Sequence, residues 1–235
     1  MVKNIVIIDS KDKNINSNST SDFYITTLKF NDVIKIKILE IQIPISWYNI
    51  RSGQQNIYVN STLYTIPSAS YTASTLLTEL QTLLTSYTVT YNSATLKYTI
   101  AATGNFTLNC SQWDIGMLNI LGFNNQDLTG TNSYTSQNMI ILNPDTKLTL
   151  HSSLGQQTLN TIMYSDNRTS ILLDIPIFSA LNSYQFFQPI NPIEFYLKQK
   201  INLTKIDFQL KDKQQQIIDL NGIDIILKLE VTTEG

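Results

Sequence analysis

The sequence predicts a mainly β protein: an antiparallel β-sandwich of the jelly-roll or Greek-key type with a small α+β insertion that carries two short helices. Many short segments rich in β-branched residues alternate apolar with polar side chains, which is the pattern of half-buried strands. Only two segments have the period of an amphipathic helix, and no helix separates the strands of the C-terminal half, so those strands are expected to pair antiparallel. A chain of 235 residues can bury a sizeable core without disulfides or metals.

Three strands are expected near the N-terminus, over residues 5–8, 23–30 and 33–43, with a polar loop between the first two. In the third segment, the apolar alternation slips by one residue between Ile38 and Leu39. A β-bulge at this point would keep both apolar sets on the core side. Pro44 is expected to end the strand.

Residues 56–123 form the predicted insertion, and residues 1–55 and 124–235 form the predicted sandwich. The elements expected in the insertion are a hairpin of 57–59 and 63–66, a helix over 72–84, a hairpin of 87–91 and 96–100, and a helix over 111–121. Asn60-Ser61 is expected at the first turn. In the second helix, Ser111 with Asp114 is expected to form a capping box, and Gly122 to end the helix.

After a polar stretch at 124–137, further strands are expected in the C-terminal half. These are 139–142, 147–151, 161–164, 171–177, 193–197, 203–210 and 223–231. The last strand has the most regular alternation in the chain, and it places one apolar row toward the core.

Charged residues are sparse, at 14% of the chain against about 25% in an average domain, and Lys plus Arg 16 nearly balances Asp plus Glu 18. Neutral surfaces rich in amides and hydroxyls are common where a protein is packed into a larger assembly, although an AT-rich genome would give the same composition. No basic field of the kind that nucleic-acid binders carry is present. The sequence shows no signal peptide and no membrane span, and it predicts a protein kept in a reducing compartment.

No residue pattern predicts catalysis, a cofactor or a metal, so we expect a protein that is not an enzyme. His151 is expected to be a partly exposed residue at a strand end, because no Gly-x-Ser-x-Gly elbow accompanies it. Cys110 could gain a lowered pKa from a helix N-terminus, but a small core residue is the favoured interpretation. The spacing of four aspartates matches no EF-hand, and strand ends and turns explain them: Asp207, Asp212, Asp219 and Asp224.

Aromatic residues offer two further interpretations. Trp47, Tyr48 and Trp113 are candidates for carbohydrate binding, although Trp113 is expected to fill the core. The segment SWYNIRSGQQN combines residue types that are enriched at interface hot spots. Its assembly contacts would be Trp47, Tyr48, Asn49 and Arg51, and a packed corner is the equal alternative.

Several segments resemble a known family. These are IVIIDSKDKN, SDFYITTLKFNDVIKIKILEIQIPISWYNIRSGQQNIYV, YTIPSASYTASTLLTELQTLLTSYTVTYNSATLKYTIAATGNFTL, LGF at 121–123 and KIDFQLKDKQQQIIDLNGIDIILKLEV. They are similar to the single-jelly-roll penton and related minor capsid proteins of double-jelly-roll DNA viruses, such as virophages and large algal viruses. The resemblance covers both ends and the first half of the chain. One departure is the loop KDKQQQ, which lacks the glycine often present there.

The resemblance implies a virion protein that forms homopentamers at the fivefold vertices of an icosahedral capsid. It implies the trimeric major capsid protein as a partner, with assembly inside the infected host cell, and neither a specific nucleic acid nor a membrane span. Alternatives are a minor or cement capsid protein and a receptor-binding spike or fibre domain. A glycan hydrolase or lyase is the third class, and it would require convergent carboxylates in a cleft.

Overall fold

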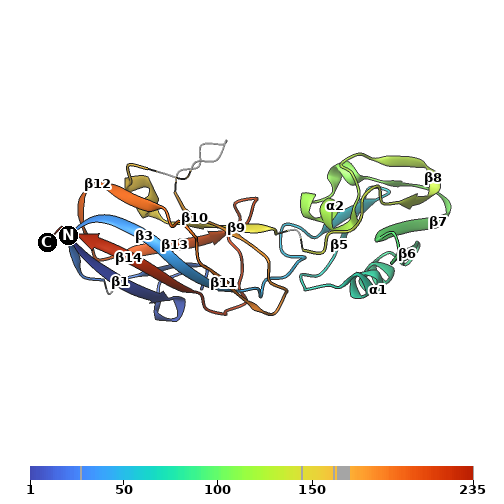
Figure 1. Ribbon diagram of the computed structural model, residues 1–235. Helices are drawn as coiled ribbons and strands as arrows, with labels where there is room; N and C mark the ends of the chain where they lie inside the picture. The colour runs from blue at the N-terminus through green and yellow to red at the C-terminus, as the bar shows by residue number, and fades with distance from the viewer. Residues whose placement is uncertain (27, 144, 161, 163–169, 235) are drawn as a thin grey trace. The chain divides into compact units, whose positions relative to one another are not determined.

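The computed structural model describes residues 1–26, 28–143, 145–160, 162 and 170–234, and the chain divides into two compact units (Figure 1). The sandwich unit comprises Met1–Trp47 and Asp145–Gly235, and the insertion unit comprises Tyr48–Pro144. The insertion unit contains the module predicted at 56–123. Its boundaries lie further out, because a strand after residue 123 pairs inside it and Ile50 bridges to Ala69.

The sandwich unit contains two antiparallel sheets with an apolar core formed by residues of both, which confirms the predicted sandwich. The five-stranded sheet has the order β1 (Val2–Asp9), β14 (Ile226–Thr233) and β3 (Phe30–Pro44), followed by β11 (Tyr184–Phe187) and β12 (Glu194–Leu203), which pair with different stretches of β3. The four-stranded sheet has the order β10 (Ile171–Pro176), β9 (Lys147–His151), β13 (Ile206–Lys211) and β2 (Asp22–Ile25). Short 3-10 turns follow two strands: η1 (Ser10–Asp12) and η3 (Ser153–Gln157).

The first and last strands of the chain pair along their whole length, from Val2 opposite Thr233 to Asp9 opposite Ile226. The two termini therefore lie side by side (Figure 1). Both ends of the sequence belong to one two-sheet body.

The predicted β-bulge is confirmed at Leu39. Against β14, Glu40 lies opposite Lys228 and Ile38 lies opposite Leu229, so Leu39 is the extra residue of β3. All four flanking isoleucines are buried in the core: Ile36, Ile38, Ile41 and Ile43. The bulge lets both halves of the strand present their apolar face to the same side.

Several predicted strands of the sandwich have different bounds in the structure, and two of them are divided between the two sheets. The strand expected at 23–30 ends at Ile25, and Phe30 already belongs to β3. The strand expected at 203–210 is divided, because β12 lies in the five-stranded sheet and β13 in the four-stranded one, so the chain crosses between sheets after Leu203. Strand β11 was not predicted, and residues 161 and 163–164 of the strand expected at 161–164 lie outside the described residues.

The insertion unit is a five-stranded antiparallel sheet with two helices. Its strands are β5 (Thr62–Thr65), β4 (Asn56–Val59), β7 (Lys97–Leu108) and β6 (Thr88–Asn92), in that order, and β8 (Leu128–Thr135) also pairs with β7. The helices are α1 (Ala73–Leu83) and α2 (Ile115–Leu121). The apolar stripe of α1 is buried at Leu76, Leu80 and Leu84, as its period predicts.

Two predictions for the region between β7 and β9 are wrong. Strand β8 lies inside the expected polar stretch 124–137, and Tyr134 is its one buried residue. Backbone pairing with β7 holds this strand in place. Its sequence therefore does not need to alternate apolar with polar residues. Residues 139–142 are not a strand, although the N–H of Ile140 donates to the carbonyl oxygen of Leu96 at 2.9 Å.

The predicted start of the second helix is also wrong. A 3-10 turn, η2 (Cys110–Gln112), precedes α2, which begins at Ile115. No capping box forms: the Ser111 hydroxyl donates to Asp127 at 2.7 Å, and the Asp114 carboxylate accepts from the backbone N–H groups of Gln55 and Asn56. These more distant hydrogen-bonding partners outcompete the local cap. Gly122 does end the helix, with a left-handed φ of 76°.

The loop after β13 forms its turn without a glycine. Gln215 adopts a positive φ of 66°, and its backbone N–H donates to the carbonyl oxygen of Asp212. The buried carboxylate of Asp212 accepts from the N–H of Gln216 at 2.8 Å. An aspartate-stabilised turn therefore forms this loop without a glycine.

Deletion of Leu39 tests the bulge. Removing this residue turns either Ile36 and Ile38 or Ile41 and Ile43 away from the core, so we expect a loss of about 4 kcal/mol or more in the free energy of unfolding. Substitution Leu39→Ala keeps the register and should cost about 1 kcal/mol or less. Urea unfolding monitored by circular dichroism measures both, and equal stability of the two variants would contradict the role of the bulge.

Candidate functional site

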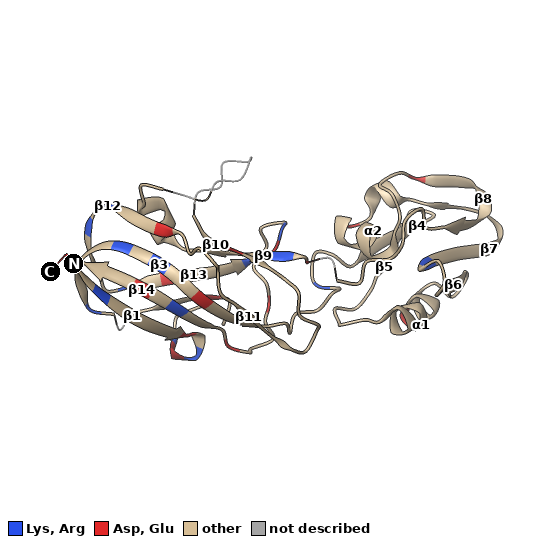
Figure 2. Cartoon of the chain, viewed as in Figure 1, with Lys and Arg blue, Asp and Glu red and all other residues tan. Residues whose placement is uncertain are grey.

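The outer face of the five-stranded sheet is the first candidate site. It points away from the core, and it carries most of its charged side chains on β3, β12 and β14 and exposed apolar side chains on β1 and β11. We call it the ladder face; its residues are Lys3, Ile5, Ile7, Lys35, Lys37, Glu40, Gln42, Tyr184, Phe186, Glu194, Tyr196, Lys228 and Glu230. Strand alternation places them together, since every second side chain of a strand points to the same face. Basic and acidic residues lie on neighbouring strands of this sheet in Figure 2.

Glu194 organises the charges on the ladder face. Its Oε1 atom lies 3.0 Å from the Nζ of Lys35 and 3.7 Å from the Nζ of Lys37, and its Oε2 accepts the hydroxyl of Tyr196 at 2.7 Å. The Tyr196 hydroxyl, followed by Lys35, lowers the pKa of Glu194 to about 2. The carboxylate therefore stays charged under any ordinary solution condition.

Apolar side chains stand exposed at the two opposite edges of the ladder face. On β1, Ile5 is 54% exposed and Ile7 is 70% exposed. On β11, Tyr184 and Phe186 are each 59% exposed. Exposed apolar groups at both edges of one sheet are typical of an interaction surface rather than of a solvated one.

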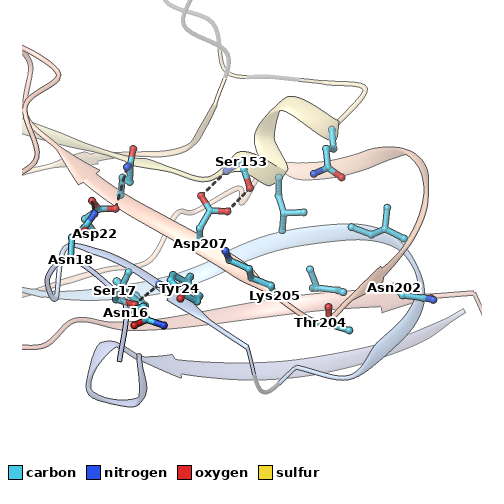
Figure 3. A pocket seen from close by; sticks show the side chains of 16 residues that line it. Asn16, Ser17, Asn18, Asp22, Tyr24, Ser153, Asn202, Thr204, Lys205 and Asp207 are labelled. Carbon is cyan, nitrogen blue, oxygen red and sulfur yellow. Dashed lines mark hydrogen bonds between the residues drawn. The ribbon is translucent and has the colours of Figure 1, made fainter. Parts of the chain in front are cut away.

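A hollow on the four-stranded sheet is the second candidate site (Figure 3). It has a volume of about 580 Å³, and it is lined by residues of β2, β13 and η3, by the end of β12, and by the loops at 16–18 and 204–205. The ammonium group of Lys205 lies 4.0 Å from the ring centroid of Tyr24. The hollow therefore presents a cation, an aromatic ring and several amides to solvent.

Both carboxylates in the hollow are held by this chain's own donors. Asp207 accepts from the backbone N–H of Ser153 at 3.0 Å and from the hydroxyl of the same residue. Asp22 accepts from the side-chain amides of Asn18 at 2.6 Å and Gln209 at 3.1 Å. These bonds tie the loop at 16–18 and η3 to the sheet, which gives the carboxylates a structural role.

The four residues predicted as assembly contacts separate into two pairs. Trp47 is buried in the core of the sandwich unit, and Asn49 is buried in the insertion unit, where its side chain bonds the backbone of Tyr71 and Leu142. Both side chains are buried within this chain, which is what the packed-corner interpretation expects; an assembly role for Trp47 and Asn49 stays a prediction. Tyr48 is exposed, and the guanidinium of Arg51 lies 3.4 Å from its carbonyl oxygen; their assembly role stays a prediction.

The expectation for His151 requires a correction. It lies at the end of β9 as predicted, but it is buried rather than partly exposed. Its Nε2 lies 2.9 Å from the hydroxyl of Thr149, and its Nδ1 lies 2.9 Å from the hydroxyl of Ser170. Hydrogen-bonding neighbours inside the fold explain the burial.

Cys110 and Trp113 are both core residues of the insertion unit. Burial raises the pKa of the Cys110 thiol to about 12, which is opposite to the lowering that a helix N-terminus would give. The indole of Trp113 donates to the carbonyl oxygen of Tyr58 at 2.9 Å. Neither side chain is available to a ligand.

The four aspartates have separate partners. Asp207 and Asp212 accept the bonds described above, Asp219 accepts from the N–H of Asn221, and Asp224 accepts from the hydroxyl of Ser10. Within the described ranges, no three His, Cys, Asp or Glu residues gather in a way that would hold a metal ion. Their closeness in sequence thus reflects turns and strand ends, as the sequence predicts.

The sequence interpretation missed the apolar edges of the ladder face. Strand β11 has only four residues, Tyr184–Phe187, which is too short for apolar alternation to indicate a strand. The outward direction of Ile5 and Ile7 was not visible, because the run at 5–8 is uniformly apolar. Only the pairing with β14 shows which residues face outward.

No family model and no curated protein matches this sequence. A search of solved structures finds the mavirus penton protein, with a TM-score of 0.53 and 13% identity, covering 100% of both chains. A chain in the cryo-EM structure of the Sputnik virophage matches with a TM-score of 0.48 and 12% identity, covering 99% of this chain and 97% of that one. The alignment with the mavirus penton protein shows that the chain has that protein's fold along its whole length. In the described part of the chain, no helix is long and apolar enough to cross a membrane.

Thiol labelling tests the burial of Cys110. Because the thiol is buried and its pKa is raised to about 12, we expect no reaction with Ellman's reagent at pH 8 in the folded protein. One thiol per chain should react after unfolding in guanidinium. Rapid labelling of the native protein would show that the insertion unit opens or that Cys110 is accessible.

Acid titration tests the Glu194 cluster. Because the folded pKa of about 2 lies below the ordinary 4.5, this group stabilises the fold above pH 4.5, and that contribution is lost as the pH falls toward 2. NMR titration should give a pKa near 2 for Glu194 in the wild type and a clearly higher value in Tyr196→Phe. An unchanged pKa in that variant would mean that the hydroxyl contributes nothing.

Proposed function

We propose that this protein is a structural subunit of a viral capsid, and that it closes the fivefold vertices as a homopentamer. The observation that carries the proposal is the fold: the chain aligns with the mavirus penton protein over 100% of both chains, although only 13% of residues are identical. Its place would be in the virion, with assembly inside the infected cell and the major capsid protein as its neighbour.

The surface chemistry supports an assembly role. Charged residues are few in the insertion unit, and many of its other exposed residues carry amides or hydroxyls. The five charged residues are Arg51, Glu79, Lys97, Asp114 and Asp127. A surface of this kind forms hydrogen-bonded, partly hydrated contacts with low desolvation cost. On the sandwich unit, the exposed apolar edges of the ladder face offer contact area to neighbours.

The environments of the potentially reactive side chains support a non-catalytic role. Cys110 and His151 are buried, and the carboxylates of Asp22 and Asp207 are bonded to this chain's own donors. Each of these groups has a structural partner or a core position. We therefore propose that the protein acts through packing alone.

Recombinant protein tests the proposal. Native mass spectrometry and negative-stain microscopy should show pentamers, alone or on addition of the major capsid protein of the same virus. Co-assembly should place five copies at each vertex in a cryo-EM map. A chain that stays monomeric and is absent from co-assembled capsids would contradict the proposal, and density at another capsid position would favour a minor or cement protein.

A further inference from the structure

Two strands of the five-stranded sheet have an open edge. Among the described strands, β1 pairs with β14 alone, and β11 pairs with β3 alone. The third peripheral strand, β12, is different: the N–H of Leu159 donates to the carbonyl oxygen of Tyr196 at 2.7 Å, and the N–H of Tyr196 donates to the side chain of Asn160. Its edge is thus covered by this chain, whereas β1 and β11 lie at the two opposite sides of the sheet.

The middle of strand β1, residues 4–8, lacks the usual protection of an edge. Soluble proteins place charges, proline or bulges on long edge strands to prevent pairing with other chains. Residues 4–8 of β1 carry no charge and no proline, and β1 pairs with β14 in unbroken register. This five-residue stretch, in which Ile5 and Ile7 are exposed, is therefore suited to accept another strand.

Strand β11 fits that position by charge, direction and face. Its four residues are uncharged, so pairing with 4–8 of β1 buries no charge on either side. Every neighbour in the order β1, β14, β3, β11 is antiparallel, so β1 and β11 run in opposite directions. A second copy placed beside the first with its strands in the same orientation would continue the antiparallel alternation.

The exposed side chains of the two edges also match. Ile5 and Ile7 point to the ladder face at one edge, and Tyr184 and Phe186 point to the same face at the other. Edge-to-edge pairing would place β-branched residues next to aromatic ones, which is a favourable cross-strand combination. The contact is between two different surfaces of one chain, and repeated contacts of this type can close into a ring.

We propose that β1 of one copy pairs with β11 of the next, so that the five-stranded sheets of neighbouring subunits join at these edges. This inference rests on the proposed function, since it names the surfaces that hold the ring of copies together. The backbone of residues 4–8 and 184–187 supplies the hydrogen bonds, and the four exposed apolar side chains supply the buried area.

Substitutions at the two edges test the proposal. Ile7→Lys and Phe186→Glu each place an unpaired charge in the contact, and each should weaken pentamer formation or capsid incorporation about tenfold or more. A chain that carries both substitutions should recover most of the lost pentamer formation or capsid incorporation, because the two opposite charges would then lie side by side in the contact. The matched control is Leu63→Lys, because Leu63 is 48% exposed on β5 of the insertion unit; it should assemble like the wild type. Circular dichroism melts establish that each variant is folded.

Cross-linking gives a second readout. Copies with Ile7→Cys, mixed with copies with Phe186→Cys, should be joined by a short bis-maleimide, whereas either variant alone should not. Joining of Ile7→Cys copies to each other would indicate a two-fold contact and overturn the proposal. Wild-type pentamers with normal assembly of Ile7→Lys and Phe186→Glu would overturn it while leaving the proposed function intact. If neither the wild type nor the control forms pentamers or enters capsids, the result contradicts the proposed function itself, and the edge-pairing proposal falls with it.

Discussion

The pairing of β14 with both β1 and β3 is the interaction on which the sandwich unit depends. These three strands come from the first 44 and the last 10 residues of the chain, and their hydrogen bonds bring the termini together. The pairing buries Leu227, Leu229 and Val231 against residues of β3 and the opposite sheet. With both ends of the chain held in one body, residues 48–144 are an insertion whose two ends return to the same sandwich.

The same ladder determines where interaction surfaces are available. Alternation along β3, β14 and β12 places lysines and glutamates on the outer face, where Glu194 links Lys35, Lys37 and Tyr196. Charge pairing satisfies the centre of that face within the subunit. The exposed apolar side chains of β1 and β11 take no part in this charge pairing, and they lie on strands at the edges of the sheet. An interface is therefore expected at the edges rather than at the centre.

The residues with reactive groups contribute to stability instead. His151, Cys110 and Asp212 are buried, and the aspartates of the hollow on the four-stranded sheet bind loops to strands. Loop 211–216 shows the same principle, since an aspartate and a strained glutamine form the turn that a glycine would form more easily. In this chain, these potentially reactive side chains therefore support the fold.

The sequence by itself determined the sandwich, the bulge at Leu39, the helix stripe of α1 and the glycine end of α2, because each depends on local periodicity or on one residue's conformational preference. Only the tertiary structure decided the polar strand β8, the short strand β11, the start of α2 and the burial of Trp47, Asn49 and His151. These depend on partners distant in the chain: β7 for β8, β3 for β11, and Asp127 for Ser111. Backbone pairing and distant hydrogen bonds leave no period in the sequence, since any polar residue can take part in them.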